Sequence, residues 1–471
     1  MHDMLFTILL FTLAGCCHSL GNSTLEGLTV YGPYALGFRE LTTSSPFYNE
    51  TIHEYVWYPS GARSTFNSDH AVVYPLPSFY TSQISQTGDV TPIPNKKFPI
   101  IFIAPNLFNS PGFLVTLCEN LSTWGFIVVA FGLSFDDAQA ARAELAAGRT
   151  FYDDFFPRLL QVSWEITRWT EQDNFLSASI MPDKIGVTGY SFGGGVALLT
   201  VYGHEPSGYE PDERVKAIAP IDMGCPLCFI VEDKLFNLTD FDEIFDPEVQ
   251  IDPADLPQFR TPTNASIQFI VADKAFDDGE PTTLDFAWFQ SETVFPLIDT
   301  SGVKMWVKVE DSSHQHFWDA CKVIDYMVSL GLAEEDWGIV VGDDLVTYFK
   351  QLYKQVCGPD ASLSALNTQE ISSLYLVGFF KSTLTTDNDG SCWAGYLSPQ
   401  YSDGCAVRTQ VKEDGLVLPE NIPACLESAI GSDLPGFEPS EQCSYSSGAG
   451  VLGLCLSSSV MVVGVLVALA M

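Results

Sequence analysis

The sequence predicts an α/β fold with a doubly wound, mostly parallel sheet and a Cys-rich C-terminal extension. Continuous apolar runs alternate with helical patterns between residues 98 and 272, and such runs are typical of strands buried on both faces. One of them, 185–188, enters a Gly-x-Ser-x-Gly turn, and an Ala/Leu-rich helical pattern leaves it. Strand, helix and strand in this rhythm indicate right-handed βαβ units and a parallel sheet.

The elements follow in order along the chain. Aromatic and β-branched runs near 32–38 and 54–60, bounded by Gly, Pro and Ser, predict antiparallel strands that open the sheet. Residues 61–97 are rich in Ser, Pro and Gln, which favours long surface loops, and the acidic, Pro-punctuated segment 232–260 favours an inserted loop or cap. Further strands are expected at 98–104, 125–131, 185–188, 215–222, 266–272 and 303–309, and helices at 114–124, 137–149, 155–169, after residues 191 and 318, and at 343–356.

The composition excludes some classes of protein. Of 471 residues, 46% are hydrophobic, which is enough for a sizeable core and excludes a disordered chain. The 59 acidic against 22 basic residues give a formal charge of −37, and this charge repels phosphate backbones. No nucleic-acid partner is therefore expected.

Both ends of the chain are apolar. Residues 1–19 have the length of a signal peptide, although the start lacks Lys or Arg, and Cys16 would also suit a bacterial lipoprotein site. Residues 448–471 form a hydrophobic tail with no basic cluster after it, which favours a GPI-anchor signal over a single spanning helix. We expect a chain that is exported and tethered to the extracellular face of a membrane.

Two further features agree with export. Asn-x-Ser/Thr sequons occur at Asn22, Asn49, Asn120, Asn237 and Asn264. Nine cysteines lie between the two ends, and most should pair in an oxidising compartment, with at least one left over. Cys225 and Cys228 have no second Cys/His pair at zinc-ligand spacing, so disulfides are the expectation there. Residues 28–357 are predicted as the catalytic domain and 358–447 as a disulfide-stapled extension.

The Gly-x-Ser-x-Gly turn predicts an α/β-hydrolase fold with Ser191 as nucleophile. The flanking glycines keep Cβ atoms out of a sharp turn, and the N–H of Phe192 lies at a helix start, where it can stabilise an oxyanion. A serine hydroxyl also needs an imidazole to take its proton and a carboxylate to fix the imidazole tautomer. In this fold the partners follow in the order Ser, Asp/Glu, His.

Three histidines follow the nucleophile. His204 comes too soon after the turn, whereas His314 and His316 stand where a late strand gives way to a helix; we favour His314 as the base and keep His316 as the alternative. Two acids fit the order. Asp222 ends an apolar strand, where a stray carboxylate would be costly to bury, and Asp277 follows the next strand. We favour Asp222 and keep Asp277 open.

Several stretches carry a family resemblance that covers roughly residues 32–350. The chain resembles the platelet-activating-factor acetylhydrolases of the secreted, calcium-independent phospholipase A2 type and, more distantly, polyester cutinases, chlorophyllases and dienelactone hydrolases. The most specific stretches are 189–194 and 313–319. The others are 32–37, 58–60, 98–102 and 124–128.

This resemblance implies a Ser191, His314 and Asp222 triad, with Asp277 favoured instead by the cutinase branch. It also implies oxyanion donors at the backbone N–H groups of Phe192 and Leu107. The chain departs from the family at Pro105-Asn106, where a His-Gly pair is usual, and at Tyr190, where a His is usual.

The sequence thus predicts a serine carboxylic-ester hydrolase, lipase- or esterase-like, that forms an acyl-serine intermediate and needs no cofactor or metal. Its expected partner is a small-molecule or lipid ester with a short or medium acyl chain. The alternative is a catalytically idle α/β-hydrolase domain that serves as a cell-surface recognition module. Such a domain need not keep Ser191, His314 and an acid together.

Overall fold

The structure is a computed structural model of the 471-residue chain. It describes residues 31–47, 50–74, 81–88, 90–106, 110–134, 151–204, 208–223, 262–274, 291, 294–338, 343–358, 365–385 and 407–411. The predicted signal peptide, the hydrophobic tail, the segments 137–149 and 232–260, and most of the predicted extension lie outside these residues.

A single mixed sheet organises the described part of the chain, where eleven strands follow the order β11-β10-β9-β8-β7-β5-β6-β2-β1-β4-β3. Strands β10, β9, β8, β7, β5 and β6 are parallel, and β2, β1 and β11 pair antiparallel at the flanks. The strands are β1 (Tyr34–Ser44), β2 (Thr51–Ala62), β3 (Ala71–Val73), β4 (Thr81–Gln86), β5 (Phe98–Ala104), β6 (Ile127–Gly132), β7 (Ile180–Tyr190), β8 (Val215–Ile221), β9 (Ser266–Lys274), β10 (Lys304–Ser313) and β11 (Val407–Val411). Strands β5 and β6 are fully buried, as their unbroken apolar runs predict.

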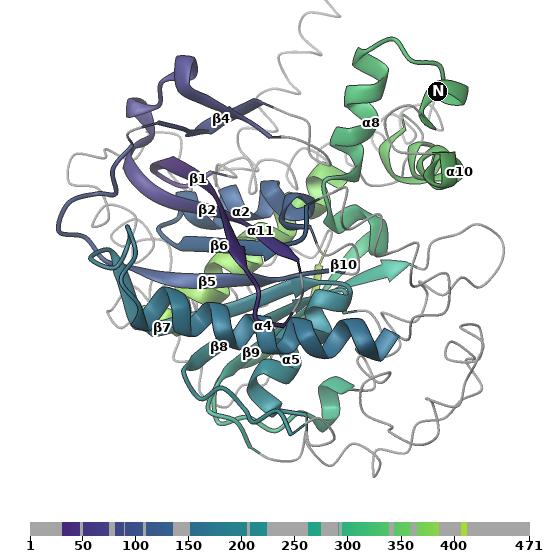
Figure 1. Ribbon diagram of the computed structural model, residues 1–471. Coiled ribbons are helices and arrows are strands. Elements are labelled where there is room, and N and C mark those ends of the chain that lie inside the picture. The colour runs from purple at the N-terminus through teal and green to yellow at the C-terminus, as the bar shows by residue number, and fades with distance from the viewer. Residues whose placement is uncertain are drawn as a thin grey trace, which may run out of the picture. The chain divides into compact units, whose positions relative to one another are not determined.

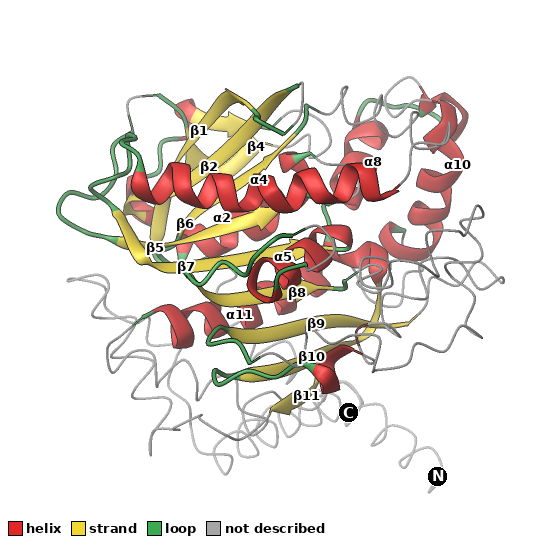
Figure 2. Ribbon diagram, turned by 60° about the horizontal axis from the view of Figure 1, so that its bottom comes forward, coloured by secondary structure: helices red, strands yellow, loops and turns green. Residues whose placement is uncertain are grey.

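Helices cover both faces of the sheet. Figure 1 shows α4 (Phe151–Glu171) and α5 (Phe192–Tyr202) in front of the strands and α2 (Val115–Thr123) and α11 (Ala365–Leu384) behind them. The shorter helices α8 (Ala320–Ser329) and α10 (Asp343–Leu352) lie to one side of the sheet (Figure 2). This doubly wound arrangement is the predicted α/β-hydrolase fold.

Two parts of the structure differ from the sequence-based expectation. Strands β3 and β4 form within the segment expected to be loops. The polar residues of β4 can be buried because Ser82 and Ser85 donate hydrogen bonds to the buried carboxylate of Glu119. Helix α11 and strand β11 lie beyond residue 357, within the predicted extension, yet β11 pairs with β10. The compact unit that contains the described residues runs from residue 30 to 419.

Helix α11 is part of the core. It contacts β7 to β10 and α2, and Phe380 is fully buried on its inner face. A Cβ at Gly186 of β7 would come within 2.8 Å of the Phe380 ring, so only glycine leaves room for this helix. The helix is buried around most of its surface, with polar residues such as Thr368 and Ser373 buried beside the apolar ones. It therefore lacks the 3.6-residue alternation by which a surface helix is recognised.

A buried ionic cluster joins α4 to β2. Arg168 donates to Glu165, at 2.8 Å, and to Glu54, and both carboxylates are fully buried. Burial, followed by the charge of Glu54, raises the pKa of the Glu165 carboxyl to about 7. Burial likewise raises the pKa of Glu54. The two carboxylates therefore share one guanidinium, and burial favours the protonated form of each.

Among the described residues, no helix is both long and apolar enough to cross a membrane. One predicted sequon lies in an unsuitable place: Asn120 is fully buried in α2, and its Nδ2 donates to Ser373 Oγ at 3.1 Å. Asn264 is exposed. The sequons at Asn22, Asn49 and Asn237 lie outside the described residues.

Candidate active site

The nucleophile candidate Ser191 stands between β7 and α5 at the carboxyl edge of the parallel sheet. Its backbone has φ 56° and ψ −123°, a strained conformation for a residue with a Cβ. A Cβ at Gly189 would overlap the Gly193 carbonyl, and one at Gly193 would overlap the Ala104 carbonyl of β5. The two glycines are therefore required for the sharp turn that presents Ser191, as the sequence predicted.

His314 lies at the same carboxyl edge of the sheet as Ser191, with two strands between those that the two residues follow. It begins the 3₁₀ helix η8 (His314–Phe317) immediately after β10 and is 5% exposed. Its Nε2 lies 3.0 Å from Ser191 Oγ. Strands β8 and β9 separate β7 from β10 in the sheet, so the two residues, 123 positions apart in the chain, meet above the ends of those strands.

Asp222 completes the hydrogen-bonded chain. It follows β8 directly, is 1% exposed and places Oδ2 2.5 Å from His314 Nδ1. Its other oxygen, Oδ1, accepts the backbone N–H of Ala272 at 3.0 Å, which fixes the orientation of the carboxylate. The backbone φ of Asp222 is 39°, in the left-handed region that Asp tolerates better than most residues.

The geometry assigns the protons within this chain. An ionised carboxylate can only accept, so His314 Nδ1 carries the hydrogen that faces Asp222. Nε2 of the neutral ring is then the acceptor for the hydroxyl proton of Ser191. The arrangement can therefore deprotonate the serine as it attacks a carbonyl and store the proton on a ring that the carboxylate stabilises.

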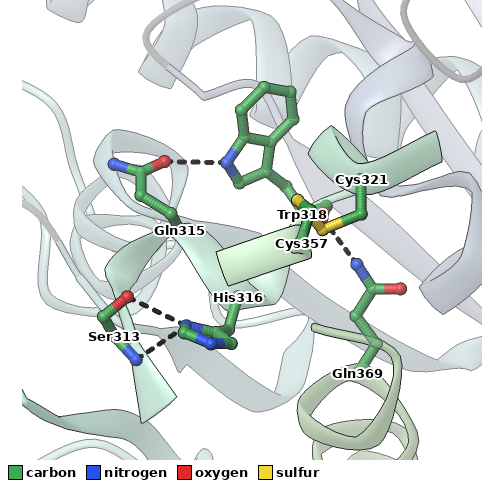
Figure 3. Close-up of a disulfide and its surroundings, with 7 residues drawn as sticks. All are labelled: Ser313, Gln315, His316, Trp318, Cys321, Cys357 and Gln369. Carbon is green, nitrogen blue, oxygen red and sulfur yellow. Dashed lines mark hydrogen bonds between the residues drawn. A yellow bond between two sulfur atoms is a disulfide. The ribbon is translucent and has the colours of Figure 1, made fainter. Parts of the chain in front are cut away.

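The two other histidines that follow Ser191 in the chain make different contacts. His316 Nδ1 is turned back onto Ser313, 2.9 Å from both its backbone N and its Oγ (Figure 3). His204 is buried just after α5, where its backbone pairs with Tyr209. Asp277 and Leu107 lie outside the described residues, whereas Phe192 opens α5 as predicted.

Two residues that sequence analysis did not identify as part of the site contact the segment from His314 to Trp318. The Tyr190 hydroxyl donates to the backbone carbonyl of His314 at 2.9 Å, and the two rings lie 4.7 Å apart between centroids. In the sequence, Tyr190 stands out only because the resembling family usually has a His at this position. Gln369 of α11 donates to the Trp318 carbonyl at 2.6 Å, and no sequence pattern links this helix to the site.

A disulfide lies beside the same segment. Cys321 of α8 is bonded to Cys357, which ends the helical turn Tyr353–Cys357 after α10 (Figure 3). Cys118 is a free, buried thiol within the described part of the chain, and burial raises its pKa. The Cys225–Cys228 pair lies outside it. No group of three or more His, Cys, Asp and Glu side chains that could hold a metal ion occurs in the described residues.

Comparison with known proteins finds only a distant structural likeness. No family model matches the sequence, and no curated protein matches it. Among solved structures, the chain is similar to a ferulic acid esterase from Streptomyces cinnamoneus, with 17% identity and a TM-score of 0.47. The match covers 81% of this chain and 96% of that one. A likeness at this level carries no information about the activity or substrate of this protein.

Proposed function

We propose that the protein is a serine carboxylic-ester hydrolase in which Ser191 is the nucleophile, His314 the general base and Asp222 the acid. The observation that carries the proposal is the unbroken chain Asp222–His314–Ser191, with contacts of 2.5 and 3.0 Å. It is supported by the strained backbone of Ser191, because such strain in a non-glycine residue is typical of a functional turn. An idle domain has no need to maintain either feature.

The reaction follows from this geometry. As Ser191 Oγ attacks the ester carbonyl, its proton passes to His314 Nε2, and Asp222 stabilises the resulting imidazolium. The carbonyl oxygen becomes an oxyanion beside the first turn of α5, where the N–H of Phe192 belongs to the positive end of the helix. His314 then protonates the leaving alcohol, which leaves an acyl-serine. A water molecule deprotonated by His314 releases the acid and restores the serine.

We further propose short- or medium-chain acyl esters, including lipid-like ones, as substrates. The resemblance of residues 189–194 and 313–319 to acetylhydrolase motifs supports this class. We also propose that the protein is exported and attached to the extracellular face of a membrane, which the apolar ends of the sequence support.

The test is hydrolysis of p-nitrophenyl esters of graded chain length by the full chain, beside Ser191→Ala. We expect turnover that ranks the acyl lengths, its loss in the variant, and labelling of Ser191 by a fluorophosphonate probe. Folded protein that neither hydrolyses any ester nor takes up the probe would refute the proposal and indicate the recognition module instead.

A further inference from the structure

A buried arginine connects two segments that border the nucleophile. Arg158 of α4 is 1% exposed. It donates from a terminal guanidinium nitrogen to the backbone carbonyl of Asn106, which lies two residues after β5. The same guanidinium lies over the ring of Phe192, 4.7 Å from the ring centroid. One side chain thus contacts both the turn after β5 and the first residue of α5.

These two segments are the ones from which oxyanion donors are expected. The N–H of Phe192, at the start of α5, is the expected donor that lies within the described residues. The second donor, Leu107, is implied only by the family resemblance and lies outside them. By holding the Asn106 carbonyl and the Phe192 ring at once, Arg158 keeps the turn after β5 against the start of α5. The two segments also pack closely next to the donor, because a Cβ at Gly193 would overlap the Ala104 carbonyl.

The charge on Arg158 adds to this effect. A hydrogen bond from a cation is roughly twice as strong as a neutral one, so the Asn106 carbonyl is held firmly in place. The attraction between the guanidinium and the Phe192 ring keeps the start of α5 against the same anchor. Both contacts are buried, where they are screened little by water.

We propose that Arg158 is a positioning residue for the oxyanion site, which it organises by holding the Asn106 carbonyl and the Phe192 ring together. This inference rests on the proposed ester hydrolysis. It also accounts for a sequence feature that the triad leaves unexplained. Pro105-Asn106 replaces the His-Gly pair of the resembling family, and the buried arginine anchors the altered turn from the neighbouring helix.

The experiment compares Arg158→Met, Arg158→Lys and Val162→Ala in the full chain. Val162 is fully buried on the same helix, so its truncation loosens α4 without removing either contact of Arg158. Active sites are counted by complete labelling with a fluorophosphonate, and kcat is expressed per labelled site. The inhibition constant of an alkyl trifluoromethyl ketone, which forms a tetrahedral adduct with the serine, is measured in parallel.

We expect Arg158→Met to lower kcat per labelled site about 10- to 100-fold with KM changed less than about threefold. The inhibition constant should rise by the same factor as kcat falls, because the adduct carries the oxyanion that the site binds. Arg158→Lys should restore part of the loss, since it keeps the charge and one donor but not the planar fork. Val162→Ala should keep the wild-type kcat per labelled site.

Wild-type kcat per labelled site in Arg158→Met, or a loss no larger than in Val162→Ala, would overturn the proposal. If Arg158→Met does not fold, Arg158→Lys decides: an unchanged inhibition constant for the ketone in that variant would overturn it as well. Failure of the proposed function is a separate outcome, because it would appear as absence of turnover and labelling in the wild type.

Discussion

Replacement of Asp222 by Asn is the sharpest test of the candidate triad. In the structure, Asp222 Oδ1 accepts the N–H of Ala272 at 3.0 Å, and Oδ2 faces His314 Nδ1 at 2.5 Å. The amide oxygen of Asn should keep the first contact, because only an acceptor can face a backbone N–H. Its NH₂ group then faces His314 Nδ1.

This orientation of the amide forces the other tautomer of the imidazole. Two donors cannot face each other, so the ring must carry its hydrogen on Nε2 and accept at Nδ1. Nε2, 3.0 Å from Ser191 Oγ, then donates to the serine and can no longer remove its proton. A triad held in the wrong tautomer loses about 10⁴-fold in kcat, which is about 5.5 kcal/mol of transition-state stabilisation.

The fold should tolerate the change. Asn has the shape of Asp and, like Asp, tolerates the backbone φ of 39° at this position. We expect Asp222→Asn to melt within a few degrees of the wild type, so that the lost activity cannot be ascribed to unfolding.

The assay is kcat for p-nitrophenyl butyrate per folded protein, measured beside Asp277→Asn as the matched control. Both variants exchange one carboxylate for an amide, and they distinguish the two acids that the sequence left open. Asp277→Asn should keep kcat within about twofold of the wild type. A loss of 10³-fold or more in Asp277→Asn, with activity retained in Asp222→Asn, would refute the reasoning.

Three further predictions concern stability and modification. Folding raises the pKa of Glu165 from its ordinary value of 4.5 to about 7, so the folded chain keeps this proton to a higher pH than the unfolded chain. The free energy of unfolding should therefore fall as pH rises between these two values, by at most about 3 kcal/mol. Melting temperature against pH should show this fall in the wild type and a flatter profile in Glu165→Gln; equal profiles would contradict it. Phe380→Ala should cost about 3–5 kcal/mol in urea unfolding, because the buried ring fills the space between α11 and β7, and a loss below about 1 kcal/mol would mean that α11 does not cover the core. In a secretory expression host, glycopeptide mass spectrometry should find a glycan on exposed Asn264 and none on buried Asn120; a glycan on Asn120 would contradict the structure.

The local features of this protein are predictable from its sequence because each depends on neighbours in the chain. Unbroken apolar runs predicted β5 and β6 to within two residues, since strands buried on both faces cannot alternate between apolar and polar residues. The turn around Ser191 was predictable for a steric reason, because a Cβ at Gly189 or Gly193 would overlap a backbone carbonyl. The chain order of nucleophile, acid and base narrowed the candidates to a few residues.

Only the tertiary structure decided which of these candidates meet. His314 and His316 are two residues apart in one motif, yet one ring faces Ser191 and the other turns back onto Ser313. Asp222 meets His314 across 92 positions because β8 ends beneath it in the sheet. The sequence gives no sign of the roles of helix α11 and Arg158, because α11 mixes polar and apolar residues on all its faces and a single arginine has no distinctive pattern. Their roles depend on contacts between segments that are far apart in the sequence, and the local sequence pattern does not show which distant segments come together.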